Sequence, residues 1–205
     1  VRQVIVKTPR IAMAEMAAAF YGYPARGMRI VGVTGTNGKT STTYMLKAIA
    51  EQCGWKVGLI GTIRNLIGTR IIDTERTTPE SVDLQRILRE MKEEDVDLVV
   101  MEVSSHSLDQ NRVHGIAFET AIFTNLTQDH LDYHKTFENY FAAKMRIFAQ
   151  AQQAVVNRDD PHAERILGEL SIPYKTFGIR EKADVSAAEI DITTRGVQFD
   201  MHCAL

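Results

Sequence analysis

The sequence has few cysteines, no long apolar run and no excess of charge of one sign. Its two cysteines, Cys53 and Cys203, lie far apart, which argues against a disulfide scaffold and against a cysteine zinc site. No apolar run approaches the roughly 20 residues of a membrane-spanning helix. Lysine and arginine number 24 against 26 acidic residues, so neither nucleic acid nor an anionic membrane is expected as the main partner.

The chain also lacks the pattern of a secretory signal at its start, so we expect a cytoplasmic protein. Hydrophobic residues make up 44% and charged residues 24% of the 205 residues, as in a globular domain. A domain of this length hides roughly 70% of its unfolded surface. The sequence begins without Met and its last residues have a strand pattern, so we expect a piece of a longer polypeptide.

Strands and helices are expected to alternate from residue 28 onward, which is typical of a parallel sheet built from βαβ units. Apolar runs predict strands at 28–33, 57–60, 98–103, 120–123 and 154–156, and a hairpin over 64–73. Apolar periodicity predicts helices at 10–21, 38–53 and 137–149, and another that starts with Thr78 as N-cap and Pro79 at N1. The expected buried stripes of the second and the last of these helices are Leu46, Ile49, Ala50 and Cys53, and Leu84, Ile87, Leu88 and Met91.

The predicted fold class is therefore α/β: a P-loop-type domain with a mainly parallel sheet flanked by helices. A smaller β-rich portion follows from Val185, with a turn at residues 194–196. We see no internal repeat.

A phosphate-binding loop is the strongest functional signal. It follows an apolar strand and opens a helix, where backbone N–H groups and the helix N-terminus favour an anion. Its residues are Gly35, Thr36, Asn37, Gly38, Lys39, Thr40 and Ser41. Lys39 is expected to reach the β- and γ-phosphates and Thr40 to contact Mg²⁺. The first glycine of the strict pattern is Val33 here, so a glycine-rich turn with a surface lysine is the alternative.

An acidic residue, Glu102, ends the apolar strand predicted at 98–103. Such a residue can hold Mg²⁺ directly or through water, as the acidic strand residue of P-loop enzymes does. The alternative is an acid that faces solvent. The phosphate loop favours the metal-binding interpretation.

Two histidines, His130 and His134, are four residues apart and could share a helix face. A zinc site is disfavoured because the H-E-x-x-H pattern is absent. We interpret His130 as a ligand of a nucleotide-bound metal, and we expect His134 to be a surface or capping residue.

Lys144 lies on an otherwise aromatic helical stripe with Phe137, Phe141 and Phe148. A buried cation is costly unless it is paired or modified. The pattern alone favours a lysine whose stem packs while its amine reaches water.

Polar donors gather near the predicted ends of the strands. Thr77 and Thr78 precede Pro79, and they could cap the helix or present hydroxyl and N–H groups to an anionic substrate. Further donors follow the acidic strand, at Ser104, Gln110 and Arg112. A serine next to a histidine could suggest a hydrolase, but the G-x-S-x-G elbow is absent.

Taken together, these motifs resemble the Mur ligase family, and among its branches the UDP-N-acetylmuramoyl-tripeptide synthetases, which add the third residue of the peptidoglycan stem peptide. The matching stretches are TGTNGKTS (34–41), TTP (77–79), MEVSSHSL (101–108), DHLDYH (129–134) and AAKMRIF (142–148). Resemblance runs from about Pro9 to the end. GTNGKT alone is shared with folylpolyglutamate synthases.

The resemblance implies an ATP- and Mg²⁺-dependent amide ligase of cell wall synthesis that acts on a UDP-N-acetylmuramoyl dipeptide and a free amino acid. The implied ATP-binding residues are 35–41. The implied contacts of the UDP-muramoyl dipeptide are Thr77, Thr78, Ser104, Gln110 and Arg112. The implied metal-site residues are Thr40, Glu102, His130 and Lys144, and the implied catalytic residues are Lys39, His130 and Lys144, the last matching the family's carbamylated lysine. Arg76 stands where the family often has Asn, so no role is transferred to it.

The resemblance also implies a domain layout. Residues 1–26 would be the tail of an N-terminal UDP-binding domain and a linker, and residues 27–205 a truncated central ATP-binding domain, with the C-terminal amino-acid-binding domain absent. Two alternatives stay open: another ligase of the superfamily, such as a folylpolyglutamate synthase, and a nucleotide-binding fragment without catalytic activity. The amino acid that is added and the oligomeric state stay undetermined.

Overall fold

Apolar runs form the inner strands of one large sheet in the computed structural model, which describes residues 3–73 and 76–203. The strand order is β10-β9-β8-β7-β6-β1-β5-β2-β3-β4, and the strands from β9 to β2 run parallel to their neighbours. The bounds of all the strands in this sheet are β1 Arg29–Thr34, β2 Val57–Ile60, β3 Asn65–Ile67, β4 Arg70–Ile72, β5 Leu98–Glu102, β6 Phe118–Phe123, β7 Ala151–Asn157, β8 Tyr174–Gly178, β9 Val185–Thr193 and β10 Gly196–Cys203.

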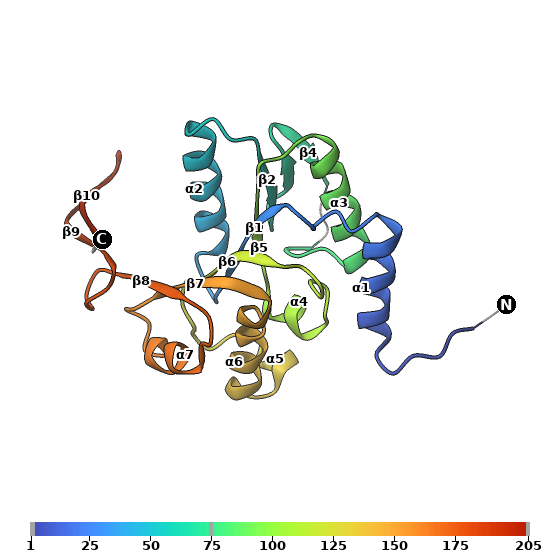
Figure 1. Ribbon diagram of the computed structural model, residues 1–205. Helices are drawn as coiled ribbons and strands as arrows, with labels where there is room; N and C mark the ends of the chain where they lie inside the picture. Colours follow the sequence, from blue (N-terminus) through green and yellow to red (C-terminus); the bar gives the residue numbers. More distant parts are fainter. Residues whose placement is uncertain (1–2, 74–75, 204–205) are drawn as a thin grey trace.

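Helices cover both faces of this sheet, which is why β5 is buried along its whole length. Their bounds are α1 Pro9–Phe20, α2 Lys39–Gln52, α3 Ser81–Glu93, α4 Ser105–Asp109, α5 Leu131–His134, α6 Phe137–Met145 and α7 Ala163–Glu169, with a 3₁₀ turn at Phe148–Gln150. One core cluster contains buried residues of α3, α4, α6 and α7, whereas α2 packs on a separate, smaller cluster with Leu46 and Ala50. The predicted α/β fold with a mainly parallel sheet is therefore confirmed (Figure 1).

The β-rich C-terminal portion is also confirmed, as the antiparallel hairpin β9–β10. It joins the edge of the main sheet through β8, and Figure 1 shows it projecting from the body of the domain. The opposite edge ends in the antiparallel strands β3 and β4, which form the predicted hairpin around Gly68. Within the described ranges, no helix has the length and apolar character that crossing a membrane requires.

Two expectations about helices were wrong. The third long helix begins at Ser81, and its N-cap is Glu80, because the Thr78 side chain is used elsewhere: its hydroxyl donates to the carbonyl of Glu102. The stripe expected on α2 is only partly buried. Leu46 and Ala50 pack inward, but Ile49 is 63% exposed and Cys53 is exposed.

The remaining differences concern element ends and short elements. The helix expected over 137–149 ends at Met145 and continues as the 3₁₀ turn, whereas the buried stripe of α3 is confirmed in full. The strand β8 and the short helices α4, α5 and α7 were not predicted, because four to seven residues give too little periodicity.

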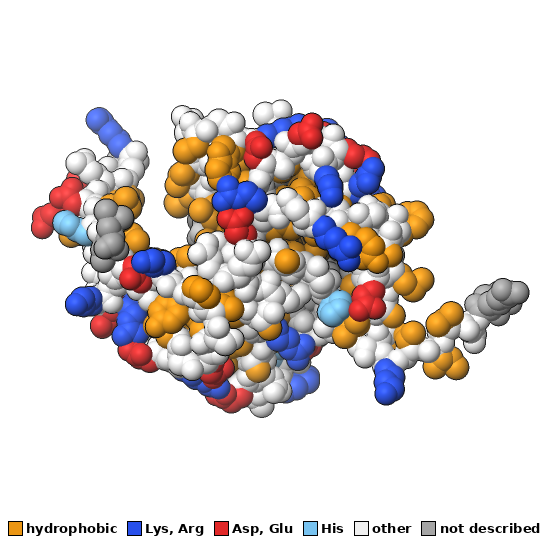
Figure 2. Space-filling view, viewed as in Figure 1, with side chains coloured by type: hydrophobic (Ala, Val, Ile, Leu, Met, Phe, Trp, Pro, Cys, Tyr) orange, Lys and Arg blue, Asp and Glu red, His pale blue; other side chains and the backbone are white. Residues whose placement is uncertain are grey.

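Exposed apolar side chains gather on α1, where Met16 and Phe20 are 72% and 82% exposed, on α2 and on the hairpin β9–β10. On α2, Met45 and Ile49 are 65% and 63% exposed, and Figure 2 shows hydrophobic side chains over this helix. On the hairpin, the exposed side chains are Ile190, Ile192, Val197, Phe199 and Met201.

The contrast between α3 and α2 can be tested with matched isoleucines. We expect Ile87→Ala, which truncates a side chain of α3 that is 2% exposed, to lower the free energy of unfolding by about 2–5 kcal/mol. Ile49→Ala on α2 should change it by no more than about 0.5 kcal/mol, because that side chain already faces water. Urea unfolding followed by circular dichroism measures both, and equal losses would contradict this assignment of faces.

Candidate nucleotide and acceptor site

The loop between β1 and α2 is shaped by two glycines with positive φ, Gly35 at 141° and Gly38 at 85°. A Cβ atom on Gly35 would lie 2.0 Å from Thr124 Oγ1, so no side chain fits there. The loop is also held from the end of β6, because the backbone N–H groups of Thr36 and Asn37 donate to the carbonyl and the Oδ1 of Asn125, at 2.8 and 2.9 Å. The chain thus keeps its backbone close to whatever the loop binds.

Lys39 begins α2 and folds back over this loop. Its Nζ donates to the carbonyls of Gly35 and Thr36, at 2.9 and 2.8 Å. Burial lowers the pKa of Lys39, while Glu102 and Asp129 act in the opposite direction. The amine is therefore a loop residue and not the surface lysine of the alternative interpretation. Ser41, in the first turn of α2, is exposed.

Glu102 is the carboxylate of the site, at the carboxyl end of β5 and only 1% exposed. Its Oε1 accepts from Thr40 Oγ1 and from the backbone N–H of Thr62, both at 2.9 Å, and its Oε2 accepts from Thr62 Oγ1 at 3.1 Å. The alternative of a solvent-facing acid is thereby excluded. Glu102 and Thr40 come together as predicted.

These oxygens suit magnesium. Mg²⁺ prefers oxygen ligands and is usually held by one or two carboxylates together with phosphates, and Thr40 and Glu102 offer a hydroxyl and a buried carboxylate 2.9 Å apart. In the described part of the chain, no group of three or more His, Cys, Asp or Glu side chains is arranged to hold a metal ion. A metal held here would therefore take further ligands from a nucleotide.

Lys144 is buried on α6, at 2% exposure, and not a lysine that reaches water as the pattern alone favoured. Its Nζ donates to the carbonyl of Gly35 at 2.7 Å and lies 4.7 Å from the centre of the Tyr140 ring. Burial first, and then the nearby charge of Lys39, hold the pKa of Lys144 well below its usual value. The helix stripe thus points the amine into the phosphate loop.

The two histidines of the DHLDYH stretch lie differently from each other. His130 precedes α5 in the left-handed region, with its side chain 47% exposed, and its ring contacts those of His106 and Tyr140. His134 was expected to be a surface or capping residue, but it is 5% exposed and its Nε2 lies 3.0 Å from Ser105 Oγ. Burial and the neighbouring His106 lower the pKa of His134.

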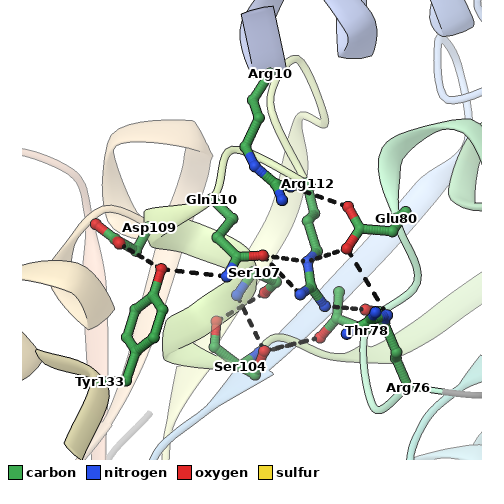
Figure 3. Close-up of polar contacts among 10 residues, drawn as sticks. All are labelled: Arg10, Arg76, Thr78, Glu80, Ser104, Ser107, Asp109, Gln110, Arg112 and Tyr133. Carbon is green, nitrogen blue, oxygen red and sulfur yellow. Dashed lines mark hydrogen bonds and ion pairs between the residues drawn. The ribbon is translucent and has the colours of Figure 1, made fainter. Parts of the chain in front are cut away.

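Four of the residues expected to contact the UDP-muramoyl dipeptide come together in Figure 3: Thr78, Ser104, Gln110 and Arg112. The Thr78 hydroxyl donates to the carbonyl of Glu102 at 2.9 Å and accepts from the backbone N–H of Ser104 at 3.1 Å. The guanidinium of Arg112 donates to the carbonyl of Thr78 and, through Nε and Nη2, to Gln110 Oε1. Ser104 also caps α4 by accepting from Ser107 N–H. The hydroxyl of half-buried Thr77 lies 3.0 Å from that of Thr62.

Glu80 gathers three arginines at the rim of this group. Arg112 Nε lies 3.1 Å from its Oε1, Arg10 Nη1 donates to its Oε2 at 3.0 Å, and Arg76 Nε lies 3.7 Å from its Oε1. Glu80 thus holds three guanidinium groups close together, and guanidinium groups are strong donors to an acidic ligand. Figure 3 shows Arg10 reaching it from α1.

Three residues of the site were missed from the sequence. Thr62 binds Glu102, Asn125 holds the loop, and the hydroxyl of Tyr140 lies 3.0 Å from Thr36 Oγ1. The sequence offered a signal for each of them. Thr62 and Asn125 follow β2 and β6, and residues beyond the carboxyl ends of parallel strands meet at one edge of the sheet. Tyr140 lies on the same helix as Lys144.

A family model described as "Mur ligase middle domain" matches residues 33–204. The chain belongs to the Mur ligase family. This Mur ligase chain is 51% identical over 198 residues to "UDP-N-acetylmuramoyl-L-alanyl-D-glutamate--2,6-diaminopimelate ligase 1" of Clostridium acetobutylicum, covering 97% of the chain and 41% of the relative. The like-named ligase of Geobacillus thermodenitrificans is 47% identical over 207 residues, covering 97% and 42%.

Solved structures agree with this Mur ligase fold. A structure of a UDP-N-acetylmuramoyl-L-alanyl-D-glutamate--2,6-diaminopimelate ligase matches with a TM-score of 0.85 and 29% identity, over 97% of this chain and 42% of that one. Folylpolyglutamate synthase of Mycobacterium tuberculosis matches with a TM-score of 0.76 over 94% and 52%, but at 16% identity it supports the fold alone. The Mur ligase chain thus spans about two fifths of the length of these curated relatives.

The burial of Lys144 predicts a pH dependence of stability. Because its pKa is lowered on folding, the unfolded chain binds its proton more tightly, and the penalty is greatest below the folded-state pKa. The penalty falls as the pH rises from there toward the ordinary lysine value of about 10.4. We therefore expect Lys144→Met to unfold at higher urea concentration than the parent at neutral pH, with the difference shrinking as the pH rises.

Urea midpoints measured at a series of pH values up to about 10 check this, with Lys175→Met on β8 as the exposed control. A difference that stays constant with pH would show that the Lys144 amine gains no free energy by staying neutral.

Proposed function

We propose that this chain is the ATP-binding part of a ligase that joins an amino acid to UDP-N-acetylmuramoyl-L-alanyl-D-glutamate in peptidoglycan synthesis. The observation that carries the proposal is that Glu102 serves two sides: its carboxylate accepts from Thr40 of the phosphate loop, and its carbonyl accepts from Thr78, which bonds Ser104 and Arg112. A nucleotide at the loop and an acidic acceptor at Thr78 and Arg112 would therefore be neighbours.

The reaction transfers the γ-phosphoryl group of ATP to the acceptor carboxylate, and the amine of the incoming amino acid then displaces phosphate from the acyl phosphate. Phosphoryl transfer needs mainly positioning and charge neutralisation. Lys39 supplies charge by moving its amine from the loop carbonyls to phosphate oxygens. Arg112 and the arginines gathered at Glu80 hold the acidic acceptor. Bound Mg²⁺, next to Thr40 and Glu102, would supply further positive charge.

His130 and Lys144 keep catalytic roles in this proposal. The exposed ring of His130 packs near the Tyr140 ring, and Tyr140 contacts the loop at Thr36, which supports a role for His130 beside a nucleotide-bound metal. The lowered pKa of Lys144 favours a neutral amine. A neutral amine can add CO₂ and release a proton, which gives a carbamate anion in place of a cation. Such an anion would relieve the repulsion from Lys39.

The relatives' names support a choice of amino acid, which the sequence left undetermined. Both curated relatives reported above are named as 2,6-diaminopimelate ligases, so we propose 2,6-diaminopimelate as the residue added. Their higher identity favours this activity over that of a folylpolyglutamate synthase. The reaction is placed in the cytoplasm, where ATP is available.

The proposed layout assigns residues 1–26 to the tail of an N-terminal UDP-binding domain with its linker, and residues 27–205 to the central ATP-binding domain. The family match over residues 33–204 supports the second assignment. Recognition of diaminopimelate is assigned to a C-terminal domain outside these residues.

Lys39→Ala tests the role of the phosphate loop. In a polypeptide of the relatives' length that contains this chain, we expect ligation to fall by on the order of 10²-fold or more, because the lost charge acts on the transferring phosphoryl group. Lys47→Ala is the control, since Lys47 lies on the same helix and pairs with Glu51. Tripeptide formation measured by mass spectrometry decides the matter, and undiminished turnover in Lys39→Ala would rule out the assignment.

The choice of amino acid and the domain layout are tested together. With ATP, Mg²⁺ and UDP-N-acetylmuramoyl-L-alanyl-D-glutamate, the longer polypeptide should ligate 2,6-diaminopimelate in preference to lysine. The 205-residue chain by itself should bind ATP·Mg²⁺ in calorimetry and form no tripeptide. Product formation by the chain alone would overturn the layout, and a preference for lysine would overturn the proposed substrate.

A further inference from the structure

Tyr133 is the middle member of a hydrogen-bonded chain that ends at Arg112. Its hydroxyl donates to Asp109 Oδ2 at 2.9 Å and receives Gln110 Nε2 at 3.2 Å. Gln110 Oε1 then accepts two bonds from the Arg112 guanidinium, at 3.1 and 2.7 Å. Figure 3 shows these side chains lying in one row that runs from Tyr133 on α5 to Arg112, next to Thr78.

The direction of every bond in this row is set by its two ends. An ionised Asp109 can only accept, so the Tyr133 hydroxyl donates to it and its oxygen is left to accept from Gln110. Arg112 can only donate, so Gln110 must present its oxygen to that side. The amide of Gln110 therefore has one allowed orientation, and a flipped amide would set N–H groups against N–H groups at Arg112.

Asp109 and Tyr133, at the end of the row opposite Arg112, are held by neighbouring side chains. Arg146, which caps the C-terminal end of α6, lies 3.3 Å from Asp109 Oδ1 and balances its charge, while Oδ2 accepts from Tyr133. The Tyr133 ring packs against the rings of His106 and His134, with centroids 4.3 and 4.8 Å away. Removing the hydroxyl alone would leave these ring contacts in place.

We infer that Tyr133 is a positioning residue of the acceptor site, which acts by fixing the Gln110 amide and through it the Arg112 guanidinium. Arg112 passes this orientation on, because its Nη1 donates to the carbonyl of Thr78 at 3.0 Å. The inference rests on the proposed function in one respect, namely that Arg112 faces the acidic acceptor. The hydrogen-bonded row itself does not depend on that function.

The first experiment reads the row directly in the 205-residue chain. Tyr133→Phe removes the hydroxyl, Asp109→Leu removes its anchor, and Tyr174→Phe, on β8 and 47% exposed, is the matched control. By NMR of ¹⁵N-labelled protein, we expect the Nε–H of Arg112 and the side-chain amide of Gln110 to exchange with solvent at least about fivefold faster in the first two variants. The control should leave both rates unchanged.

The second experiment measures ligation by the longer polypeptide with the same variants. We expect Tyr133→Phe to raise KM for UDP-N-acetylmuramoyl-L-alanyl-D-glutamate on the order of tenfold, the effect of losing about one hydrogen bond to a polar network. KM for ATP should change less than about twofold, because Tyr133 bonds no loop residue. Tyr133→Trp, which fills the space without a hydroxyl at that position, should not restore the acceptor KM.

The outcomes separate the inference from the proposed function. Unchanged exchange at Arg112 and Gln110 in both Tyr133→Phe and Asp109→Leu overturns the positioning role. An equal rise in both KM values also overturns it, because that pattern reports a general loosening of the fold. If no variant, nor the parent, ligates the dipeptide, the proposed function fails, and the exchange rates still decide whether Tyr133 orients Arg112.

Discussion

The carbonyl oxygen of Gly35 is the point on which the site depends. It accepts one hydrogen bond from the Lys39 amine, on the helix that follows the loop. It accepts a second from the Lys144 amine, 109 residues further along the chain. The Cα of the same residue lies so close to Thr124 that it admits no side chain. One residue thus joins α2, α6 and the end of β6, and the two amines point at the place where phosphate oxygens are proposed to bind.

This arrangement has a cost in stability that its proposed use explains. Two amines share one carbonyl, and the repulsion between them adds to the burial that lowers the pKa of Lys144. An isolated cation in such a place destabilises a fold. Phosphates at the loop, or a carbamate on Lys144, would replace the repulsion between the two amines by attraction. The proposed reaction would thus relieve the destabilisation.

The nucleotide side and the acceptor side of the site are joined by hydrogen bonds to the same residues. Glu102 bonds Thr40 with its carboxylate and Thr78 with its carbonyl, so the nucleotide and acceptor sides share one strand end. Arg112 then links Thr78 to Gln110 and Tyr133. The row is made of short loops and the small helices α4 and α5, whose positions depend on these bonds more than on their own propensity.

Local sequence determined the inner strands and the phosphate loop. Apolar runs gave the inner strands, and the glycine spacing with Lys39 gave the phosphate loop, because both depend on neighbours within a few residues. Only the tertiary structure decided which of the lone polar residues are buried. His134 was expected at the surface and Thr78 at a helix cap, yet both are buried by contacts with residues 29 and 24 positions away. The stripe of phenylalanines placed Lys144 on an inward face, but whether its amine reached water or Gly35 was decided by packing between distant segments, which no local pattern records.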